Sequence, residues 1–489
     1  MLKTENRKRK TENRADRPRE HCGVFGIYGH PDAARLTYFG LYALQHRGQE
    51  SCGIVTGDGA RVRQQRGLGL VPEFFKQDVL EQLPGHLAIG HVRYSTTGST
   101  VLINAQPFVV QHGGQMLAIA HNGTLTNAYA IRNRLEEAGS IFQSTMDTEI
   151  IVHLMARHRS PDLVESLTAA LSEIEGSYSL VLSTADRVIA ARDPHGFRPL
   201  CLGSLNGAWV VASETCALDL VQADYWREVE PGEIIVMDGA GLHSHKPFAP
   251  QKPRRCIFEF IYFARPDSQI FGKSVYLVRK RLGKALTREH PVQADLVMPF
   301  PDSGTYAALG YAEASHIPFE MGVIRNHYVG RTFIQPSQTM RDFSVKVKLN
   351  PVREILKGKR VLVIEDSIIR GTTTRSRVKS LREAGAVAVS LLVSCPPTRF
   401  PCFYGIDFSS KGELIAAQQQ VEQIRNFLGL DYLGYLSMEG MVAATEMDPD
   451  TFCLACFNGA YCTQVGEFSK TCFETGDEEA AREFPAVCK

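Results

Sequence analysis

The stretch that decides the fold is VLVIEDSIIRGTTT, which runs from Val361 to Thr374. It begins with a strand-length apolar run, and Glu365 and Asp366 follow that run at its carboxyl end, where open α/β sheets bind ligands. The string RGTTT then opens a helix that is predicted to reach about Ala384. Free main-chain N–H groups, small hydroxyls and the positive end of the helix dipole suit a phosphate monoester, and glycine lets the main chain approach its oxygens. The stretch therefore predicts a parallel sheet with a sugar-phosphate site at one strand end.

A second unit of the same kind precedes it. A short strand from Leu296 leads into the turn Pro301–Thr305, which is followed by a helix ending near Ser315. The turn is a second group of N–H donors beside a helix start. Between the two units, the cationic residues 328–350 predict a mobile lid, and an exposed charged loop without function is the alternative. This alternation of strand, loop and helix is typical of a parallel sheet.

Composition limits the class of protein. The chain has 489 residues, enough for two to four domains, with 44% hydrophobic and 22% charged residues. Its 54 Lys and Arg balance 53 Asp and Glu, so neither nucleic acid nor an anionic membrane is an expected partner. No apolar run approaches the ~18 residues of a membrane span. We therefore expect a soluble, cytoplasmic, multidomain protein.

The chain divides into four predicted segments. Residues 1–21 hold eight Lys or Arg and four Asp or Glu, which predicts either a disordered basic leader or a propeptide removed to expose Cys22. Residues 22–250 combine short β-runs with helical stretches such as Thr148–Arg157, and a Pro-rich basic link over 246–255 ends them. Residues 251–450 hold the parallel sheet, and residues 451–489 form a cysteine-containing tail.

The N-terminal half carries a second set of motifs in a fixed order. They are Cys22–Gly26, Gln45–Ser51, His91–Thr96, Ala120–Gly123 and Asp147–Glu149. This series resembles the N-terminal-nucleophile glutaminase domain of the class II amidotransferases. The resemblance implies that cysteine is the first residue of the mature chain and that its α-amino group is the base. A thiol near pKa 8.5 needs a base, and an α-amino group near 7.7–8.0 is neutral enough to act at pH 7–8.

The resemblance also implies residue roles. Asn122 and Gly123 supply the oxyanion hole, Arg93 binds the glutamine α-carboxylate and Asp147 binds its α-amino group. Arg47 and Gly48 belong to the same pocket, beside the catalytic Cys22. The alternative within nucleophilic catalysis is a Cys–His pair that uses one of three histidines, namely His46, His91 or His121.

The string at 361–374 is similar to the signature of type I phosphoribosyltransferases, which bind 5-phosphoribosyl-1-pyrophosphate. The resemblance implies that Glu365 and Asp366 contact the ribose hydroxyls. The implied 5-phosphate loop is Ser367, Arg370, Gly371, Thr372, Thr373 and Thr374, the implied pyrophosphate loop is Asp302, Ser303, Gly304 and Thr305, and the implied lid residues are Tyr328 and Arg331. Mg²⁺ is expected at Ser303, Glu365 and Asp366, with the substrate supplying most of its ligands. One departure is Glu365, where related enzymes often carry Asp.

The tail contains a C-x-x-C unit, Cys453 to Cys456, which on its own fits zinc, iron–sulphur or redox chemistry. Spacing does not choose two further thiolates. The segments Arg255–Glu259 and Pro401–Gly405 are similar to those that ligate a [4Fe–4S] cluster in one branch of the glutamine phosphoribosylpyrophosphate amidotransferases. That resemblance implies the cluster ligands Cys256, Cys402, Cys453 and Cys456, and structural zinc is the alternative.

Both halves together resemble the amidophosphoribosyltransferase family, iron–sulphur branch. The implied fold is an αββα glutaminase layer followed by a Rossmann-like phosphoribosyltransferase sheet. The implied reaction turns glutamine, phosphoribosyl pyrophosphate and water into 5-phosphoribosylamine, glutamate and pyrophosphate, at the start of purine synthesis. Relatives form homotetramers and are inhibited by purine nucleotides. The alternatives are a sugar-aminating class II amidotransferase, a non-enzymatic phosphoribosyl-binding regulator and a free-base phosphoribosyltransferase.

Overall fold

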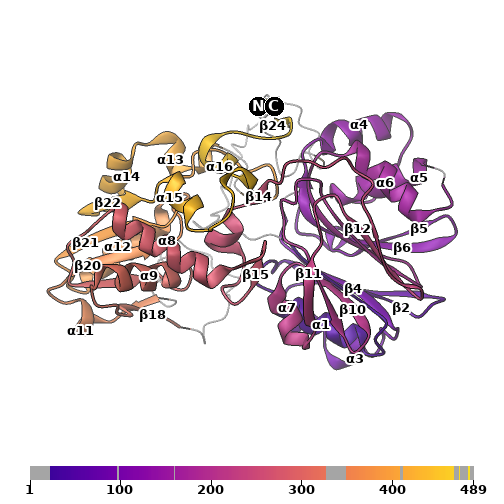
Figure 1. Cartoon of the computed structure of the whole chain (residues 1–489), viewed down its shortest axis with the longest axis horizontal. Helices are drawn as coiled ribbons and strands as arrows, with labels where there is room; N and C mark the ends of the chain where they lie inside the picture. Colours follow the sequence, from indigo (N-terminus) through magenta and orange to yellow (C-terminus); the bar gives the residue numbers. More distant parts are fainter. Residues whose placement is uncertain are drawn as a thin grey trace, which may run out of the picture.

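A computed structural model describes residues 22–95, 98–158, 160–326, 349–407 and 411–466, with residue 473 and residues 483–484. They form two bodies that lie side by side, a sheet sandwich and an α/β unit (Figure 1). The predicted leader and the lid segment up to residue 348 lie outside the described residues. In the described part of the chain, no helix is both long and apolar enough to cross a membrane.

The first body is built on two antiparallel sheets. One sheet has the strand order β11-β9-β10-β1-β4-β2-β3, and the other has the order β13-β12-β8-β7-β6-β5. The first comprises β1 Gly23–Tyr28, β2 Ser51–Gly57, β3 Val62–Leu68, β4 Leu87–Arg93, β9 Cys201–Leu205, β10 Ala208–Ala212 and β11 Asp224–Glu228. The second comprises β5 Phe108–His112, β6 Gln115–Leu125, β7 Gly176–Ser183, β8 Val188–Arg192, β12 Ile234–Asp238 and β13 Gly241–His245.

Strand β1 explains why the two sheets stack. Its side chains alternate between two faces, as in any strand. Val24 lies in the core between the sheets, whereas Phe25 and Ile27 lie in the core under the covering helices. A Cβ on Gly26 would lie only 2.8 Å from Val181 of the opposite sheet. The glycine therefore permits the close approach of the sheets at this point.

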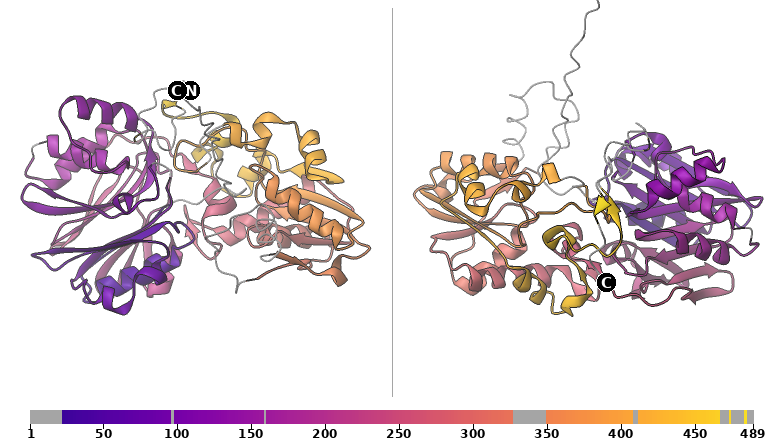
Figure 2. Two further views of the ribbon diagram at one scale, coloured as in Figure 1. Left: turned by 180° about the vertical axis from the view of Figure 1, so that it is seen from behind. Right: turned by 90° about the horizontal axis from the view of Figure 1, so that it is seen from above.

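Helices cover the outer face of each sheet, so the predicted αββα layers are confirmed (Figures 1 and 2). Those against the seven-stranded sheet are α1 Ala33–Ala43, α2 Val71–Phe74, α3 Gln77–Leu80 and α7 Thr215–Val221. Those against the six-stranded sheet are α4 Ala128–Glu137, α5 Thr148–Arg157 and α6 Leu163–Glu173, and a short 3₁₀ turn, η1, spans Leu102–Asn104.

The second body contains a parallel sheet with the order β17-β20-β21-β22. Its strands are β17 Leu296–Pro299, β20 Arg360–Glu365, β21 Ala388–Val393 and β22 Tyr432–Tyr435. The helices around it are α8 Val275–Glu289, α9 Thr305–Ser315, α11 Arg353–Leu356, α12 Thr372–Glu383, α13 Ile415–Gln418, α14 Val421–Leu428, α15 Met438–Ala443 and α16 Ala455–Asn458. This is the Rossmann-like sheet that the sequence predicts.

Short elements complete the second body. The two-residue or three-residue strands are β14 Arg255–Cys256, β15 Gln269–Ile270, β16 Lys273–Ser274, β18 Val323–Arg325, β19 Leu349–Pro351, β23 Phe452–Cys453, β24 Val465–Gly466 and β25 Glu483–Phe484. A π-helix, η2, spans Glu259–Phe263, and two 3₁₀ turns are η3 Lys411–Glu413 and η4 Pro449–Thr451. Strands β14 and β23 pair in parallel, so the start and the end of this body lie together.

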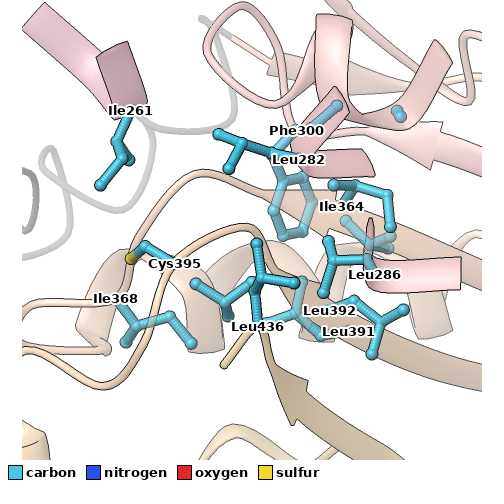
Figure 3. Packing of buried hydrophobic residues seen from close by; sticks show 14 of the residues in the cluster. Ile261, Leu282, Leu286, Phe300, Ile364, Ile368, Leu391, Leu392, Cys395 and Leu436 are labelled. Atoms are coloured by element: carbon cyan, nitrogen blue, oxygen red, sulfur yellow. The ribbon is translucent and has the colours of Figure 1, made fainter. Parts of the chain in front are cut away.

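The core of the second body supports the strand ends that carry the predicted site. Leu282 and Leu286 of α8 pack in one cluster with Ile364 of β20 and with Phe300, which follows β17 (Figure 3). The main-chain N–H of Phe300 donates to the oxygen of Ile364 over 3.1 Å. The ends of β17 and β20 are therefore held at a fixed separation, and the two predicted loops leave the sheet side by side.

Candidate functional site

Cys22 directly precedes β1 and is partly buried. Its Sγ donates to the main-chain oxygen of Tyr94 over 3.3 Å. Burial raises the pKa of the Cys22 thiol to about 11, so the group is protonated near neutral pH. A nucleophile in this position therefore needs a base that takes its proton.

The three histidines that could serve as that base have other partners. His46 Nε2 lies 2.7 Å from the carboxylate of Glu214, and His91 Nε2 lies 3.0 Å from the main-chain oxygen of His121. The ring nitrogens of His121 meet a threonine hydroxyl and a main-chain carbonyl at 3.2 and 3.3 Å. This geometry gives no support to a Cys–His pair at Cys22.

Asn122 and Gly123 lie on β6, and the position of Gly123 leaves room only for glycine. A Cβ on Gly123 would lie 2.0 Å from the main-chain oxygen of Ser177. Asn122 is fully buried, and neither atom of its side-chain amide has a hydrogen-bond partner among the described residues. A buried amide costs free energy when it is unpaired, so this one is prepared for a group that the described residues do not supply.

Arg93 and Asp147 are the two charged residues predicted to bind the amino-acid end of glutamine. Arg93 ends β4, is 3% exposed and lies 3.7 Å from the carboxylate of Glu50. Asp147 precedes α5, accepts the main-chain N–H of Leu125 over 3.0 Å and lies 3.7 Å from His121. Burial acts to raise the pKa of Asp147, but His121 and main-chain N–H groups outweigh it and lower the pKa. Both groups are therefore charged at neutral pH.

Arg47 and Gly48 are predicted to belong to the glutamine pocket. The Arg47 side chain is 1% exposed, and its guanidinium pairs with Glu214 at 2.5 Å and with Glu259 at 2.6 Å. The neighbouring Gly48 packs directly on β4, because a Cβ there would lie 2.6 Å from the main-chain nitrogen of Arg93. Two buried carboxylates therefore hold the Arg47 side chain, and Gly48 lets the main chain of this segment lie directly against β4.

The predicted phosphate loop follows β20. Glu365 and Asp366 are each 2% exposed, and Glu365 accepts a hydrogen bond of 3.0 Å from Arg377 of α12. Asp366 Oδ2 accepts the hydroxyl of Ser367 over 2.7 Å. Gly371, at the start of α12, has φ +78°, a left-handed conformation that favours glycine. The loop therefore turns sharply and presents the first N–H groups of α12 at the sheet edge.

The predicted pyrophosphate loop lies beside it. Gly304 allows this loop to pack on β20, since a Cβ there would lie 2.2 Å from the main-chain oxygen of Ile364. Asp302 is exposed and pairs with Arg325. Ser303 Oγ and Asp366 Oδ1 are buried, and neither has a hydrogen-bond partner in the described part of the chain. A hydroxyl and a carboxylate oxygen are ligands that Mg²⁺ prefers, so these two residues fit the predicted metal.

The other predicted residues of this site are located as follows. Thr305 begins α9, and Thr372, Thr373 and Thr374 form the first turn of α12. Arg370 lies in the same loop and pairs with Glu413 at 3.0 Å. Tyr328 and Arg331 fall outside the described residues.

The four cysteines predicted as cluster ligands come together from segments that are distant in the sequence. Cys256 and Cys453 are direct partners in the β14–β23 pair. Burial raises the pKa of Cys456, and the nearby Cys453, Cys402 and Cys256 raise it further. No group of three or more His, Cys, Asp or Glu within the described ranges is arranged to hold a metal ion. Four cysteine thiols, two of them buried and two partly buried, are nonetheless the donor set of a [4Fe–4S] cluster, so the residues present fit it.

Sequence reasoning missed four charged or polar groups around these sites, Glu214, Glu259, Arg198 and Tyr404. All four are buried, and their contacts join residues 61–212 positions apart in the chain. Glu259 and Tyr404 lie within segments that were noted only for their cysteines. The sequence signal for this network is Glu259, an acidic residue three positions after the predicted cluster ligand Cys256.

Comparisons with known proteins agree with this arrangement. Residues 91–220 match the glutamine amidotransferase domain family. The chain is 51% identical over 448 residues to amidophosphoribosyltransferase 1, chloroplastic, of Arabidopsis thaliana, covering 91% of this chain and 79% of that one. It is 50% identical over 454 residues to the amidophosphoribosyltransferase of a Synechocystis species, covering 91% and 92%.

Two solved structures also match over most of the chain. One is described as the structure of the allosteric regulatory enzyme of purine biosynthesis, with a TM-score of 0.88, 47% identity and coverage of 91% of this chain and 97% of that one. The other is glutamine phosphoribosylpyrophosphate amidotransferase from B. subtilis complexed with ADP and GMP. Its TM-score is 0.86 at 47% identity, and the match covers 90% of this chain and 97% of that one.

Proposed function

The chain belongs to the amidophosphoribosyltransferase family and catalyses the first step of purine biosynthesis, and we propose the residues that perform its two half-reactions. Glutamine is hydrolysed in the pocket around Cys22, and the ammonia displaces pyrophosphate from phosphoribosyl pyrophosphate at the ends of β17 and β20. The observation that carries this assignment is the buried, unpaired amide of Asn122 in the glutaminase body. The second body adds a prepared phosphate site in the same chain.

The glutaminase half-reaction starts from an N-terminal Cys22, which requires removal of residues 1–21. The free α-amino group takes the thiol proton, and Sγ attacks the amide carbon of glutamine. Asn122 Nδ2 and the N–H of Gly123 donate to the oxyanion. Arg93 and Asp147 hold the α-carboxylate and α-amino groups, with the main chain of residues 47–48 alongside. The protonated α-amino group gives its proton to the amide nitrogen, which leaves as ammonia when the thioester forms. Water then hydrolyses the thioester to glutamate and the free Cys22 thiol.

The transfer half-reaction uses the two loops of the second body. Glu365 and Asp366 accept hydrogen bonds from the ribose hydroxyls, and the first turn of α12 binds the 5-phosphate. The loop over 302–305 binds the pyrophosphate, and Tyr328 and Arg331 belong to the proposed lid. Ser303, Glu365 and Asp366 would hold Mg²⁺, which would supply positive charge beside the pyrophosphate leaving group. The lone pair of unprotonated ammonia forms a C–N bond to the anomeric carbon as the C–O bond to pyrophosphate breaks.

The proposal also covers the cysteines of the C-terminal tail, the domain boundaries, the oligomeric state, the cellular location and the regulation of the enzyme. Cys256, Cys402, Cys453 and Cys456 hold a [4Fe–4S] cluster that fixes the tail to the second body, and iron and acid-labile sulphide analysis separates it from structural zinc. We propose that the domains end near residues 250 and 450, since β13 stops at His245 and β14 begins at Arg255. A homotetramer, a cytoplasmic location and inhibition by purine nucleotides complete the proposal. The proposed nucleotide inhibition is supported by the B. subtilis relative, which is described as complexed with ADP and GMP. The Arabidopsis relative, in contrast to the proposed location, is named as chloroplastic.

The experiment that tests the assignment is pyrophosphate release from phosphoribosyl pyrophosphate with glutamine or ammonium as the nitrogen donor. Both donors should support release by the processed enzyme. An Asn122→Ala variant should lose glutamine use and keep ammonium use, because it removes an oxyanion donor only. Equal loss with both donors would contradict the division of labour. A sugar-aminating enzyme would release no pyrophosphate with either donor.

A further inference from the structure

Four fully buried charged side chains lie between the two bodies. Glu259 of η2 is 0% exposed and pairs with Arg47 at 2.6 Å and with Arg198 at 3.2 Å. Arg47 also pairs with Glu214, which accepts the N–H of Arg265 over 2.8 Å. The desolvation penalty of buried charges can exceed the Coulombic energy that their pairing gains. A network of two arginines and two carboxylates is therefore weak evidence for a purely stabilising role. Its place in the molecule gives it a second role.

One branch of the network leads to the residue proposed to bind the glutamine α-carboxylate. Arg47, held by Glu259, is followed by Gly48, and Gly48 packs on the main chain of Arg93. The segment that Glu259 holds through the Arg47 guanidinium is therefore the one that packs on the main chain of Arg93. The branch runs from the second body to the Arg93 side of the pocket.

The other branch leads to the residue proposed to bind the α-amino group. Arg198, also held by Glu259, donates to the main-chain oxygen of Tyr404 at 2.6 and 3.1 Å. The same oxygen accepts the hydroxyl of Ser177 over 2.8 Å. The main-chain oxygen of Ser177 meets His121 at 3.3 Å, and His121 lies 3.7 Å from Asp147. Both ends of the glutamine pocket are thus tied to one carboxylate.

We propose that Glu259 is a positioning residue for glutamine, acting from the second body through Arg47 and Arg198. It holds Arg93 and Asp147 at the separation that the two ends of the amino acid require. The inference rests on the proposed glutamine pocket. Glu259 is the first residue of the π-helix η2 and follows Cys256 by three residues. Single π-helical turns occur frequently at functional sites.

The test is Glu259→Gln, which keeps the volume of the side chain and removes its charge. We expect the KM for glutamine to rise about tenfold, while the ammonium-dependent rate stays within about twofold, because coupling through such contacts is of modest size. The concentration of a chloroketone analogue of glutamine needed for half-maximal alkylation of Cys22 should rise by the same factor. Glu259→Asp should restore part of the loss.

Three further variants make the result decisive. Glu233→Gln is the matched control, because Glu233 is equally buried but pairs with Arg227, outside the network. Ser177→Ala removes one hydroxyl of the second branch and should raise the KM by about threefold without affecting folding. Arg93→Ala tests the pocket itself, and a normal KM there would overturn the proposed function instead. A raised KM for glutamine in Arg93→Ala, with a normal KM in Glu259→Gln and Ser177→Ala, would overturn the inference. So would a Glu259→Gln variant that loses its ammonium-dependent activity as strongly as its glutamine-dependent activity.

Discussion

The two proposed substrate sites of this chain are built in different ways. In the glutamine pocket, the charged and polar groups lie inside a sheet sandwich: Asn122, Arg93 and Asp147 are 0%, 3% and 6% exposed. In the proposed phosphoribosyl site, Glu365 and Asp366 are also buried, but Asp302 and Thr372 are exposed at the edge of a sheet. We propose that the first site holds its ligand with buried side chains whose positions depend on distant partners. In the second, we propose that two buried carboxylates act together with main-chain groups whose positions depend on local turns.

This difference follows from the sheets. Parallel strands end together at one edge, so the loops after β17 and β20 meet without help from the rest of the chain. The antiparallel sandwich has no such edge, and its pocket is assembled from β1, β4, β6 and the start of α5. Substitutions near the glutamine pocket should therefore separate glutamine use from ammonium use, and substitutions in the phosphate loops should affect both.

The largest effect is expected for Cys22→Ala. Removal of the nucleophile should lower glutamine-dependent pyrophosphate release by at least about a thousandfold, because no other group forms the thioester. The ammonium-dependent rate should be unchanged. The two rates are measured on the same preparation, and a parallel fall of both would break the comparison between the sites.

Removal of the leader should have the next largest effect. Within an intact chain the Cys22 thiol has a pKa of about 11, so its alkylation rate should rise about tenfold per pH unit through neutral and mildly alkaline pH. A chain that begins at Cys22 carries its own base and should react about a hundredfold faster at pH 8. Identical rate–pH profiles for the two chains would exclude the α-amino group as the base.

Asp366→Asn sharpens the comparison from the other side. The change removes a buried charge that we assign to the ribose hydroxyls and Mg²⁺, and both the glutamine-dependent and the ammonium-dependent rates should fall by about a hundredfold. Titration with Mg²⁺ should show a weaker apparent affinity. Loss of glutamine use alone would mean that Asp366 serves the glutaminase instead.

Gly371→Ala should have the smallest effect. A residue with a Cβ at φ +78° is destabilised by about 1–2 kcal/mol, which should lower the free energy of unfolding by that amount. The KM for phosphoribosyl pyrophosphate should rise, with the KM for glutamine unchanged. Gly113→Ala is a matched control, since Gly113 also has positive φ but lies in the β5–β6 turn, far from both sites.

The comparison also explains what the sequence could predict. The strand at 361–364 and the acidic residues after it were predicted, and β20 runs from Arg360 to Glu365. The helix at 148–157 was predicted to the residue, and Gly385 follows α12 with φ +103°, as a C-terminal glycine should. These features depend on neighbours in the chain, which a sequence displays directly.

The side chain of Arg47 could not be predicted in the same way. Its partner Glu214 lies 167 residues away and Glu259 lies 212 residues away, so their pairing exists only after the two bodies have packed. The family resemblance assigned Arg47 to the glutamine pocket, but it did not reveal which residues the Arg47 guanidinium contacts. Spacing was equally unable to choose the cysteines that join Cys453 and Cys456.

The central claim is that glutamine chemistry in the first body depends on the second. The most direct test is glutamate release from glutamine, measured with and without phosphoribosyl pyrophosphate and Mg²⁺. We predict a large stimulation by the sugar phosphate in the wild-type enzyme, and half-maximal glutamate release by Glu259→Gln should need about tenfold more glutamine. Glutamate release at the same rate with and without phosphoribosyl pyrophosphate would contradict the account.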